Sequence, residues 1–212
     1  MKKVLCYILT IAAAALLAGC GGKDDSGEVA PESTEVVESS ETQSEILSGK
    51  HHVEITVKDY GTISVELDAD AAPISVTNFV KLAEEGFYDG LTFHRIIDGF
   101  MIQGGDPLGT GMGGSDETIK GEFSANGVEN NLSHTRGAIS MARAQNYDSA
   151  SSQFFIVHED STFLDGQYAC FGYVTEGIEV VDAICEAVPV TDNNGTVEKA
   201  NQPVIESIKV ND

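Results

Sequence analysis

Positive charge is scarce in this sequence. Its 212 residues include 12 lysines and arginines against 34 aspartates and glutamates, a formal net charge of −22. The imbalance persists from His51 onward, with 26 acidic and 8 basic side chains. Such a chain repels phosphate backbones and anionic lipid headgroups. We therefore expect no nucleic acid partner, and we interpret the acidic residues as favouring solubility.

Cysteine is also scarce, with four residues at Cys6, Cys20, Cys170 and Cys185. No spacing among them is that of a zinc site, so we expect no metal. Cys170 and Cys185 lie in apolar segments, and their spacing alone leaves both a disulfide and two free thiols open. Because both segments are apolar, we predict two buried thiols.

No hydrophobic run reaches the roughly 20 residues that a membrane-spanning helix needs. The run from Val4 to Ala18 is about 15 residues long, follows two lysines and leads into small residues. This pattern is typical of an export signal, and a permanent transmembrane helix is the weaker alternative. Its ending, LAGC at 17–20, resembles a bacterial lipobox. That resemblance implies cleavage after residue 19 and acylation of Cys20, against the alternative of an incidental or buried cysteine.

Two acyl chains hold a protein stably on a membrane, whereas one chain is marginal. We therefore expect a protein anchored through Cys20 on the extracytoplasmic face of the cell membrane. Residues 21–50 carry eight acidic side chains against Lys23 and Lys50, with much Gly, Ser and Thr. Such a segment has too little apolar content to fold, so we predict that residues 20–50 are a disordered tether. An acidic recognition segment is the alternative.

The remaining residues are enough for one hydrophobic core. Alternating apolar residues predict a hairpin of strands at 52–58 and 62–67, and helical spacing predicts a helix from Pro73 to Gly86. A second helix is expected around 178–185. Further strands are expected at 92–97, 137–142, 153–157, 168–174 and 204–210. Strands that outnumber helices without regular alternation favour an antiparallel sheet or barrel.

Two segments combine aromatic side chains with amide or guanidinium groups: FHRIIDGFMIQGGD at 93–106 and SMARAQNYDSASSQFFIV at 140–157. Strand alternation would place Arg95 on the same face as Phe93 and Ile97, an apolar face for a charge. An arginine so placed needs a partner or a substrate. We interpret it as functional, and a structural arginine paired with a carboxylate is the alternative.

The sequence is similar to cyclophilins over nearly all of residues 52–210. Six ordered blocks carry the resemblance: FHRII, GFMIQGGD, GTGMGG at 109–114, SMA at 140–142, SQFFI at 152–156 and FLDGQYACFG at 163–172. The resemblance implies that residues 51–212 form a mainly β domain, a closed eight-stranded antiparallel barrel capped by two α-helices. It also implies a peptidyl-prolyl cis-trans isomerase that acts on proline-containing polypeptides without a cofactor, and we expect a monomer.

The same blocks imply the site residues. Arg95 is the expected catalytic donor, and Gln103 is expected to brace it. The expected substrate-binding residues are Phe100, Met101, Ala142, Arg143, Gln153, Phe155, Phe163, Leu164 and Tyr168. Phe163 stands where many eukaryotic cyclophilins have tryptophan, which puts high affinity for cyclosporin in doubt. Tyr168, Asp98 and Arg143 also depart from the family pattern, and we interpret Asp98 as a solvent-facing turn residue.

Other motifs have weaker claims. The glycines at 109–114 fit a dinucleotide-binding pattern, but they open no apolar helix, so we interpret them as a flexible loop. His94, His134 and His158 could suggest a hydrolase triad, but no nucleophile-elbow motif is present. We expect each to be a structural hydrogen-bonding residue, with His94 on the strand face opposite Arg95.

Two other classes of protein compete with the enzyme. A cyclophilin-like module could bind peptides without catalysis, although the presence of Arg95 and Gln103 argues against it. A solute-binding lipoprotein or an adhesin would want a larger, two-lobed domain than this chain provides.

Overall fold

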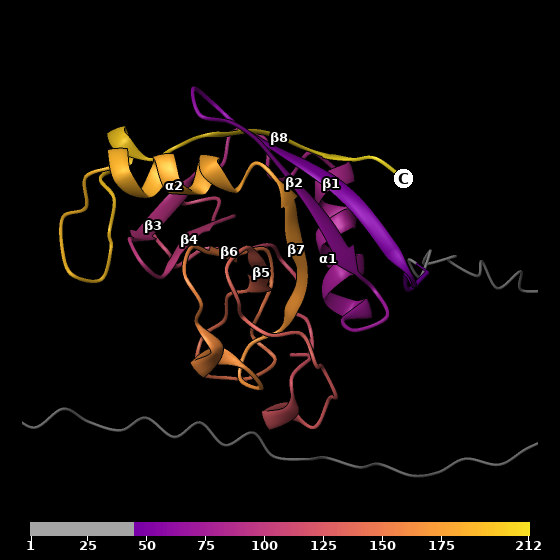
Figure 1. Cartoon of the computed structure of the whole chain (residues 1–212). Helices are drawn as coiled ribbons and strands as arrows, with labels where there is room; N and C mark the ends of the chain where they lie inside the picture. Colours follow the sequence, from indigo (N-terminus) through magenta and orange to yellow (C-terminus); the bar gives the residue numbers. More distant parts are fainter. Residues whose placement is uncertain (1–44) are drawn as a thin grey trace, which may run out of the picture. The chain divides into compact units, whose positions relative to one another are not determined.

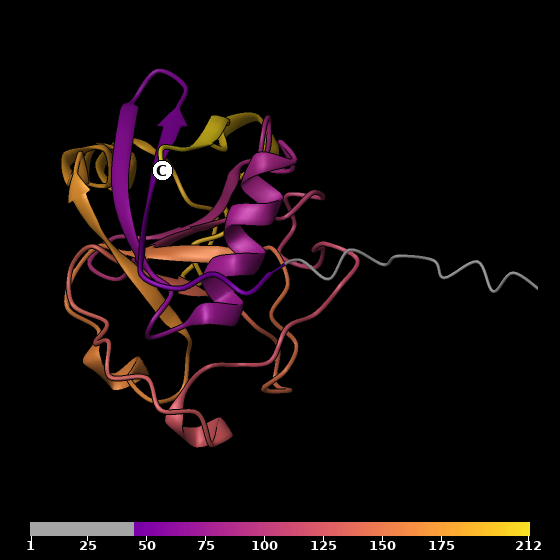
Figure 2. The same cartoon turned by 90° about the vertical axis from the view of Figure 1, so that its right-hand side faces the viewer.

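The computed structural model describes residues 45–212. The signal, Cys20 and most of the expected tether lie outside the described residues. Eight strands and two α-helices follow one another in this order: β1 (Lys50–Val57), β2 (Gly61–Asp68), α1 (Pro73–Glu84), β3 (Phe93–Ile97), β4 (Met101–Gly104), β5 (Ala138–Met141), β6 (Phe154–Val157), β7 (Cys170–Glu176), α2 (Ile178–Ala187) and β8 (Ile205–Val210). The two helices lie on different sides of the β1–β2 hairpin (Figures 1 and 2).

All eight strands belong to one antiparallel sheet with the order β3-β4-β6-β5-β7-β2-β1-β8. The expected closed barrel is not confirmed, because this order is open, with β3 and β8 at its edges. In the described residues the two edges meet through one isolated bridge, Thr92 to Val204, and neighbouring backbone hydrogen bonds. The sheet is therefore a curled half-barrel.

The β1–β2 hairpin and both helices confirm the sequence patterns to within a few residues. Val53, Ile55 and Val57 face inward on β1 and alternate with more exposed residues, as a strand with one buried face requires. Proline begins α1, a position where its missing N–H costs nothing. No helix of residues 45–212 is long and apolar enough to span a membrane.

Helix α1 receives its N-terminal cap from a distant segment. Its N-cap residue, Ala72, offers no side-chain acceptor, and the first turn holds no acidic residue. Instead, the buried carboxylate of Glu122 accepts the backbone N–H groups of Ile74 at 2.9 Å and Ser75 at 2.8 Å. It also accepts the Ser75 hydroxyl at 2.7 Å. This carboxylate fixes α1 against the loop that precedes β5.

Two separate apolar clusters result. The main core fills the inside of the curled sheet and includes Phe79 of α1 with Phe93, Ile96 and Phe154 of the strands. A smaller group, here called the outer cluster, consists of Met101, Ala138, Phe155, Val157, Leu164 and Cys170. Both Cys170 and Cys185 are buried and unpaired, which confirms the prediction of two buried thiols.

Candidate functional site

A bulge in β3 decides which way Arg95 points. The β3–β4 register shifts between Phe93 and Arg95, so His94 has no partner on β4. Phe93 therefore joins the main core together with Ile96, whereas Ile97 packs against the outer cluster. The expectation that Phe93 and Arg95 share a face is wrong, because simple alternation does not allow for the extra residue. Ile97 does share the face of Arg95.

A continuous chain of polar side chains starts at Arg95. Its Nη1 donates to Oε1 of Gln103 at 3.1 Å, and Gln103 is directly opposite on β4. Nε2 of Gln103 donates to Oε1 of Gln153 at 2.8 Å, and Nε2 of Gln153 donates to the Gly113 carbonyl at 2.7 Å. Each amide thus donates in one direction and accepts in the other, which fixes the orientation of all three side chains.

The other edge of the guanidinium is held by a residue that the sequence did not reveal. Nε of Arg95 donates to the backbone carbonyl of Asn194 at 2.8 Å, and Nη2 lies 3.3 Å from its Oδ1. The loop that carries Asn194 runs along the edge of β3, where Ile96 donates to the Gly195 carbonyl at 2.8 Å. Because the main contact is a backbone carbonyl, no side-chain motif could have indicated it.

The loop around Asn194 is tied together by one carboxylate. Asp192 accepts the backbone N–H groups of Asn194 at 2.9 Å and Thr196 at 3.1 Å. The hydrogen bond from the Thr196 N–H has the largest effect, and together these bonds lower the pKa of Asp192 below its ordinary value. Gly195 has a φ of 80°, and a Cβ there would lie 2.2 Å from the Ile96 carbonyl oxygen. Only glycine allows the loop to approach β3 this closely.

An apolar hollow of about 200 Å³ opens beside the Arg95 guanidinium. Eight of the predicted site residues line it together with Arg95 itself: Phe100, Met101, Gln103, Ala142, Arg143, Phe155, Leu164 and Tyr168. Met101, Phe155 and Leu164 are buried members of the outer cluster and form rigid walls. The structure therefore brings together residues from four segments of the chain around one pocket.

Phe163 lies outside this lining. Its side chain is 66% exposed, and its ring packs against Phe100 with 5.6 Å between centroids. The residue therefore stands at the rim, where a ligand that extends beyond the pocket would meet it, and not in the wall that holds a small ring.

A second hollow of about 360 Å³ adjoins the first and shares Gln103, Ala142 and Arg143 with it. Gln153 lines this second hollow, as does the glycine-rich loop at 111–114. The loop is organised by the buried carboxylate of Asp106, which accepts the Gly111 N–H at 2.6 Å and the Thr110 N–H at 2.9 Å. The segment is a loop, as expected, and one of its glycines, Gly113, packs closely against the Asp106 carboxylate.

Arg143 forms the partition between the two hollows. Its guanidinium carbon lies 4.5 Å from the ring centroid of Tyr168 and 4.9 Å from that of Tyr147. Nε and Nη2 donate to the Gln167 carbonyl at 3.1 and 2.8 Å. Arg143 and Tyr168 both differ from the residues usual in the family. One contact between them, a cation stacked on an aromatic face, explains both differences.

The histidines differ from one another. His134 is fully buried between Asp165, 2.8 Å from Nδ1, and the Ser140 hydroxyl, 3.0 Å from Nε2. This order of side chains resembles a hydrolase triad, but Ser140 is completely buried, so no substrate reaches it. His134 stacks on the Phe155 ring at 6.0 Å, which makes it a structural support for the pocket.

His158 is hydrogen-bonded as expected, to Gly99 and Asp182. The expectation is wrong for His94, because neither of its ring nitrogens has a hydrogen-bond partner among the described residues. Burial lowers the pKa of His94, which keeps the ring neutral and reduces the cost of its isolation.

Burial also lowers the pKa of Arg95, while Tyr168 and Asp192 act in the opposite direction. Because the ordinary value for arginine is above 12, the group remains a cation near neutral pH. A permanently charged, partly desolvated donor beside an apolar pocket is the main electrostatic feature of the site.

A curled antiparallel half-barrel of eight strands and two helices, with this pocket on its outer face, is a cyclophilin-like architecture. The cyclophilin-type isomerase of Cryptosporidium parvum, solved in the presence of the dipeptide Ala-Pro, has the same fold. Its TM-score is 0.67 at 32% identity, and the alignment covers 76% of this chain and 99% of that one.

A model of the family described as "Cyclophilin type peptidyl-prolyl cis-trans isomerase/CLD" matches residues 52–210. The chain therefore belongs to this family. Peptidyl-prolyl cis-trans isomerase B of Bacillus subtilis is 53% identical over 123 residues, which are 58% of this chain and 82% of the relative. Peptidyl-prolyl cis-trans isomerase A of Dickeya dadantii is 42% identical over 167 residues, 75% of this chain and 84% of the relative. The enzyme class expected from the sequence is confirmed.

Proposed function

We propose that this protein accelerates rotation about Xaa–Pro bonds in exported polypeptides, with Arg95 as its catalytic donor. The observation that supports this proposal most directly is the fixed guanidinium of Arg95. It is held between the Asn194 carbonyl and the Gln103 amide beside an apolar pocket. No nucleophile is required, because the reaction breaks no covalent bond.

The chemistry follows from amide resonance. The partial double bond before proline imposes a barrier of about 18–20 kcal/mol, so uncatalysed isomerisation takes tens of seconds or longer. When the bond twists, resonance is lost and the proline nitrogen becomes pyramidal with a localised lone pair. A donor aimed at that lone pair stabilises the twisted state more than either planar isomer. A gain of about 7 kcal/mol would accelerate rotation by about five powers of ten.

Arg95 has donors left for this task. A guanidinium carries five N–H bonds, and three of them are directed at Gln103 and Asn194. Two remain, and Arg95 lines the pocket in which a proline ring would lie. The bonds to Gln103 and Asn194 hold the plane of the guanidinium before substrate arrives, so little reorganisation is needed in the twisted state.

The pocket holds one side of the rotating bond. Met101, Phe155 and Leu164 would grip the proline ring, since a hollow of about 200 Å³ with buried walls suits a small apolar ring. The Gln153 amide and backbone groups near Arg143 would hold the substrate chain on either side. With the ring fixed, rotation is confined to the remainder of the peptide, and binding energy is used for orientation.

A protease-coupled assay tests this function. Chymotrypsin cleaves a chromogenic Xaa-Pro-Phe peptide only in the trans form, so the slow phase of cleavage reports cis-to-trans isomerisation. We expect the wild-type chain to accelerate the slow phase in proportion to its concentration. An inactive but folded wild type that still binds Xaa-Pro peptide would instead identify a binding module without catalysis.

The place of action is a further part of the proposal. The basic start, the short apolar run and the LAGC ending support export and a lipid anchor at Cys20, and residues 21–50 would extend the domain from the membrane. Unfolded exported chains emerge there, and proline isomerisation can limit their folding. We therefore propose that its substrates are exported polypeptides that fold outside the cytoplasm. We also propose that the enzyme is a monomer.

Metabolic labelling with a fatty-acid analogue checks the anchor. We expect label on the wild-type chain and none on Cys20→Ala, because the thiol is the acylated group. Cys6→Ala controls for the other cysteine of the N-terminal segment: if its chain is still cleaved and labelled, the loss in Cys20→Ala is specific. Unchanged labelling of Cys20→Ala would refute the anchor.

A further inference from the structure

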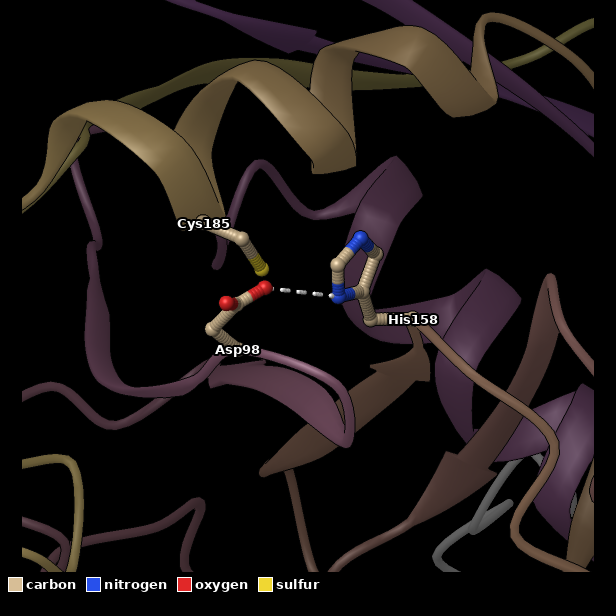
Figure 3. Close-up of side chains that lie close together, drawn as sticks. All are labelled: Asp98, His158 and Cys185. Atoms are coloured by element: carbon tan, nitrogen blue, oxygen red, sulfur yellow. Dashed lines mark ion pairs between the residues drawn. The ribbon is translucent and has the colours of Figure 1, made fainter.

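Three side chains from distant parts of the sequence meet beside the β3–β4 turn, and none of them lines the apolar pocket. They are Asp98 in the turn itself, His158 directly after β6, and Cys185 on α2 (Figure 3). Their carboxylate oxygen, ring nitrogen and sulfur atoms all lie within 4.8 Å of one another. Nδ1 of His158 lies 3.4 Å from Oδ1 of Asp98.

The hydrogen bonds of His158 define its tautomer. The Gly99 backbone N–H donates to Nδ1 at 3.0 Å, so Nδ1 carries the lone pair. Nε2 therefore carries the proton and donates to Oδ1 of Asp182 at 3.0 Å. A metal-bound imidazole commonly donates its second ring N–H to a carboxylate in the same way. In His158 the lone pair on Nδ1 is the position that a metal would take, and it now accepts the Gly99 N–H.

Asp182 is itself fixed. Nη2 of Arg136 lies 2.8 Å from both of its carboxylate oxygens, and Nη1 of Arg136 donates to the His158 carbonyl at 2.7 Å. Asp182 and Cys185 are one turn apart on α2, so they present their side chains to the same face. The orientation of the imidazole is thus set by a supported partner and does not depend on its own contacts alone.

The charges around the thiol favour a cation. Burial raises the pKa of Cys185 to about 12, the nearby carboxylates of Asp98 and Asp182 add to the rise, and the Arg136 guanidinium acts in the opposite direction. The charge of Asp182 is offset by Arg136, so the carboxylate of Asp98 is the main attraction for a divalent ion placed among the three donors. Metal binding would release the thiol proton to solvent and leave the sulfur as a thiolate ligand.

The distances suit a small tetrahedral ion after a limited contraction. Zinc bonds of roughly 2.0–2.3 Å to N, O and S place neighbouring ligand atoms about 3.3–3.7 Å apart. The His158–Asp98 pair is already at 3.4 Å, and the sulfur, which lies within 4.8 Å of both, would need to approach by no more than about an ångström. The Gly99 N–H would have to turn away from Nδ1, and both Asp98 and Gly99 are exposed residues of a tight turn.

The site also has an entrance. A hollow of about 190 Å³ is lined by both Asp98 and Cys185 and is bordered by the exposed Val190. An ion could enter through it, and a water molecule could supply the fourth ligand that three protein donors leave open.

We propose that Asp98, His158 and Cys185 bind one Zn²⁺ ion, or another thiophilic divalent ion, with Asp182 as the carboxylate that orients His158. No cysteine or histidine spacing in the sequence indicates this site, because each ligand comes from a different segment. The site is independent of Arg95 and of the isomerase proposal, so either can fail without the other.

Cobalt provides a direct test, since Co²⁺ replaces Zn²⁺ and a Co²⁺–thiolate bond gives an intense near-ultraviolet charge-transfer band. The probe is CoCl₂, titrated into the full-length chain carrying Cys6→Ser and Cys20→Ser, so that only two thiols remain. We expect a charge-transfer band that saturates at one ion per chain and is displaced by one equivalent of ZnCl₂. Absence of the band would overturn the proposal.

Matched variants identify the ligands. Cys185→Ala should abolish the band, whereas Cys170→Ala removes the other buried thiol and should leave the band unchanged. Asp182→Asn should weaken competitive Zn²⁺ binding by about 10–100-fold, the usual effect of removing a carboxylate that orients a ligand histidine. Circular dichroism checks that each variant is folded. A band that survives in Cys185→Ala, or zinc affinity unchanged in both Asp98→Asn and Asp182→Asn, would refute the site.

Discussion

Arg95→Ala is expected to lower kcat/KM for an Xaa-Pro peptide by about 10²–10³-fold, the usual loss when one preorganised transition-state donor is removed. The substrate pocket should remain, because its apolar walls belong to the outer cluster and do not depend on the guanidinium. The loss should therefore appear mainly in kcat, since the donor acts on the twisted state. The protease-coupled assay measures it.

The controls separate catalysis from folding and from net charge. Lys209→Ala removes one exposed positive charge from β8 and should leave the rate unchanged. Arg95→Lys keeps the charge but loses the planar fork that contacts Gln103 and Asn194, so it should recover little activity. Wild-type activity in a folded Arg95→Ala variant would show that the arginine is structural.

Local patterns in the sequence were sufficient for all the strands and α-helices except β4. The sequence patterns predicted β1, β2 and α1 because each of these elements has one buried face. The strands show alternating apolar residues, and the helix shows Pro73 followed by apolar residues at helical spacing. Strand β4 was absent from the periodicity-based prediction. Its four residues, MIQG, are too few for alternation to be visible, and they lie between Gly99 and Gly105.

The residues that line the pocket were largely predictable, but their geometry was not. Side chains such as Gln103 and Phe155 were found through matching blocks, and the structure places them around one pocket. The bulge at His94 and the backbone carbonyl of Asn194 left no comparable trace, because both arise from backbone pairing between distant segments. The open edge between β3 and β8 is likewise a matter of hydrogen-bond register.

Of the substitutions considered, Glu122→Ala should lower the free energy of unfolding most, by about 3–4 kcal/mol. Each hydrogen bond to a charged group contributes about 1.5–3 kcal/mol, and the contributions do not add fully. The carboxylate accepts three donors at the N-terminus of α1, and its own residue is only 1% exposed. Without it, the N–H groups of Ile74 and Ser75 lose their acceptor, and the favourable charge at the positive end of the helix dipole disappears.

Thermal and urea unfolding measure this effect. A loss of that size should lower Tm by about 10 °C in a domain of this length. Glu117→Ala removes a carboxylate of the same charge from an exposed position and should change Tm little, which controls for the relief of negative charge. If Glu122→Ala lowers the free energy of unfolding by less than about 1 kcal/mol, water replaces the carboxylate and α1 is held by its apolar face alone. Because Phe79 on that face packs against Phe154 and Phe171, a substantial loss would instead show that the cap and the core act together in fixing α1.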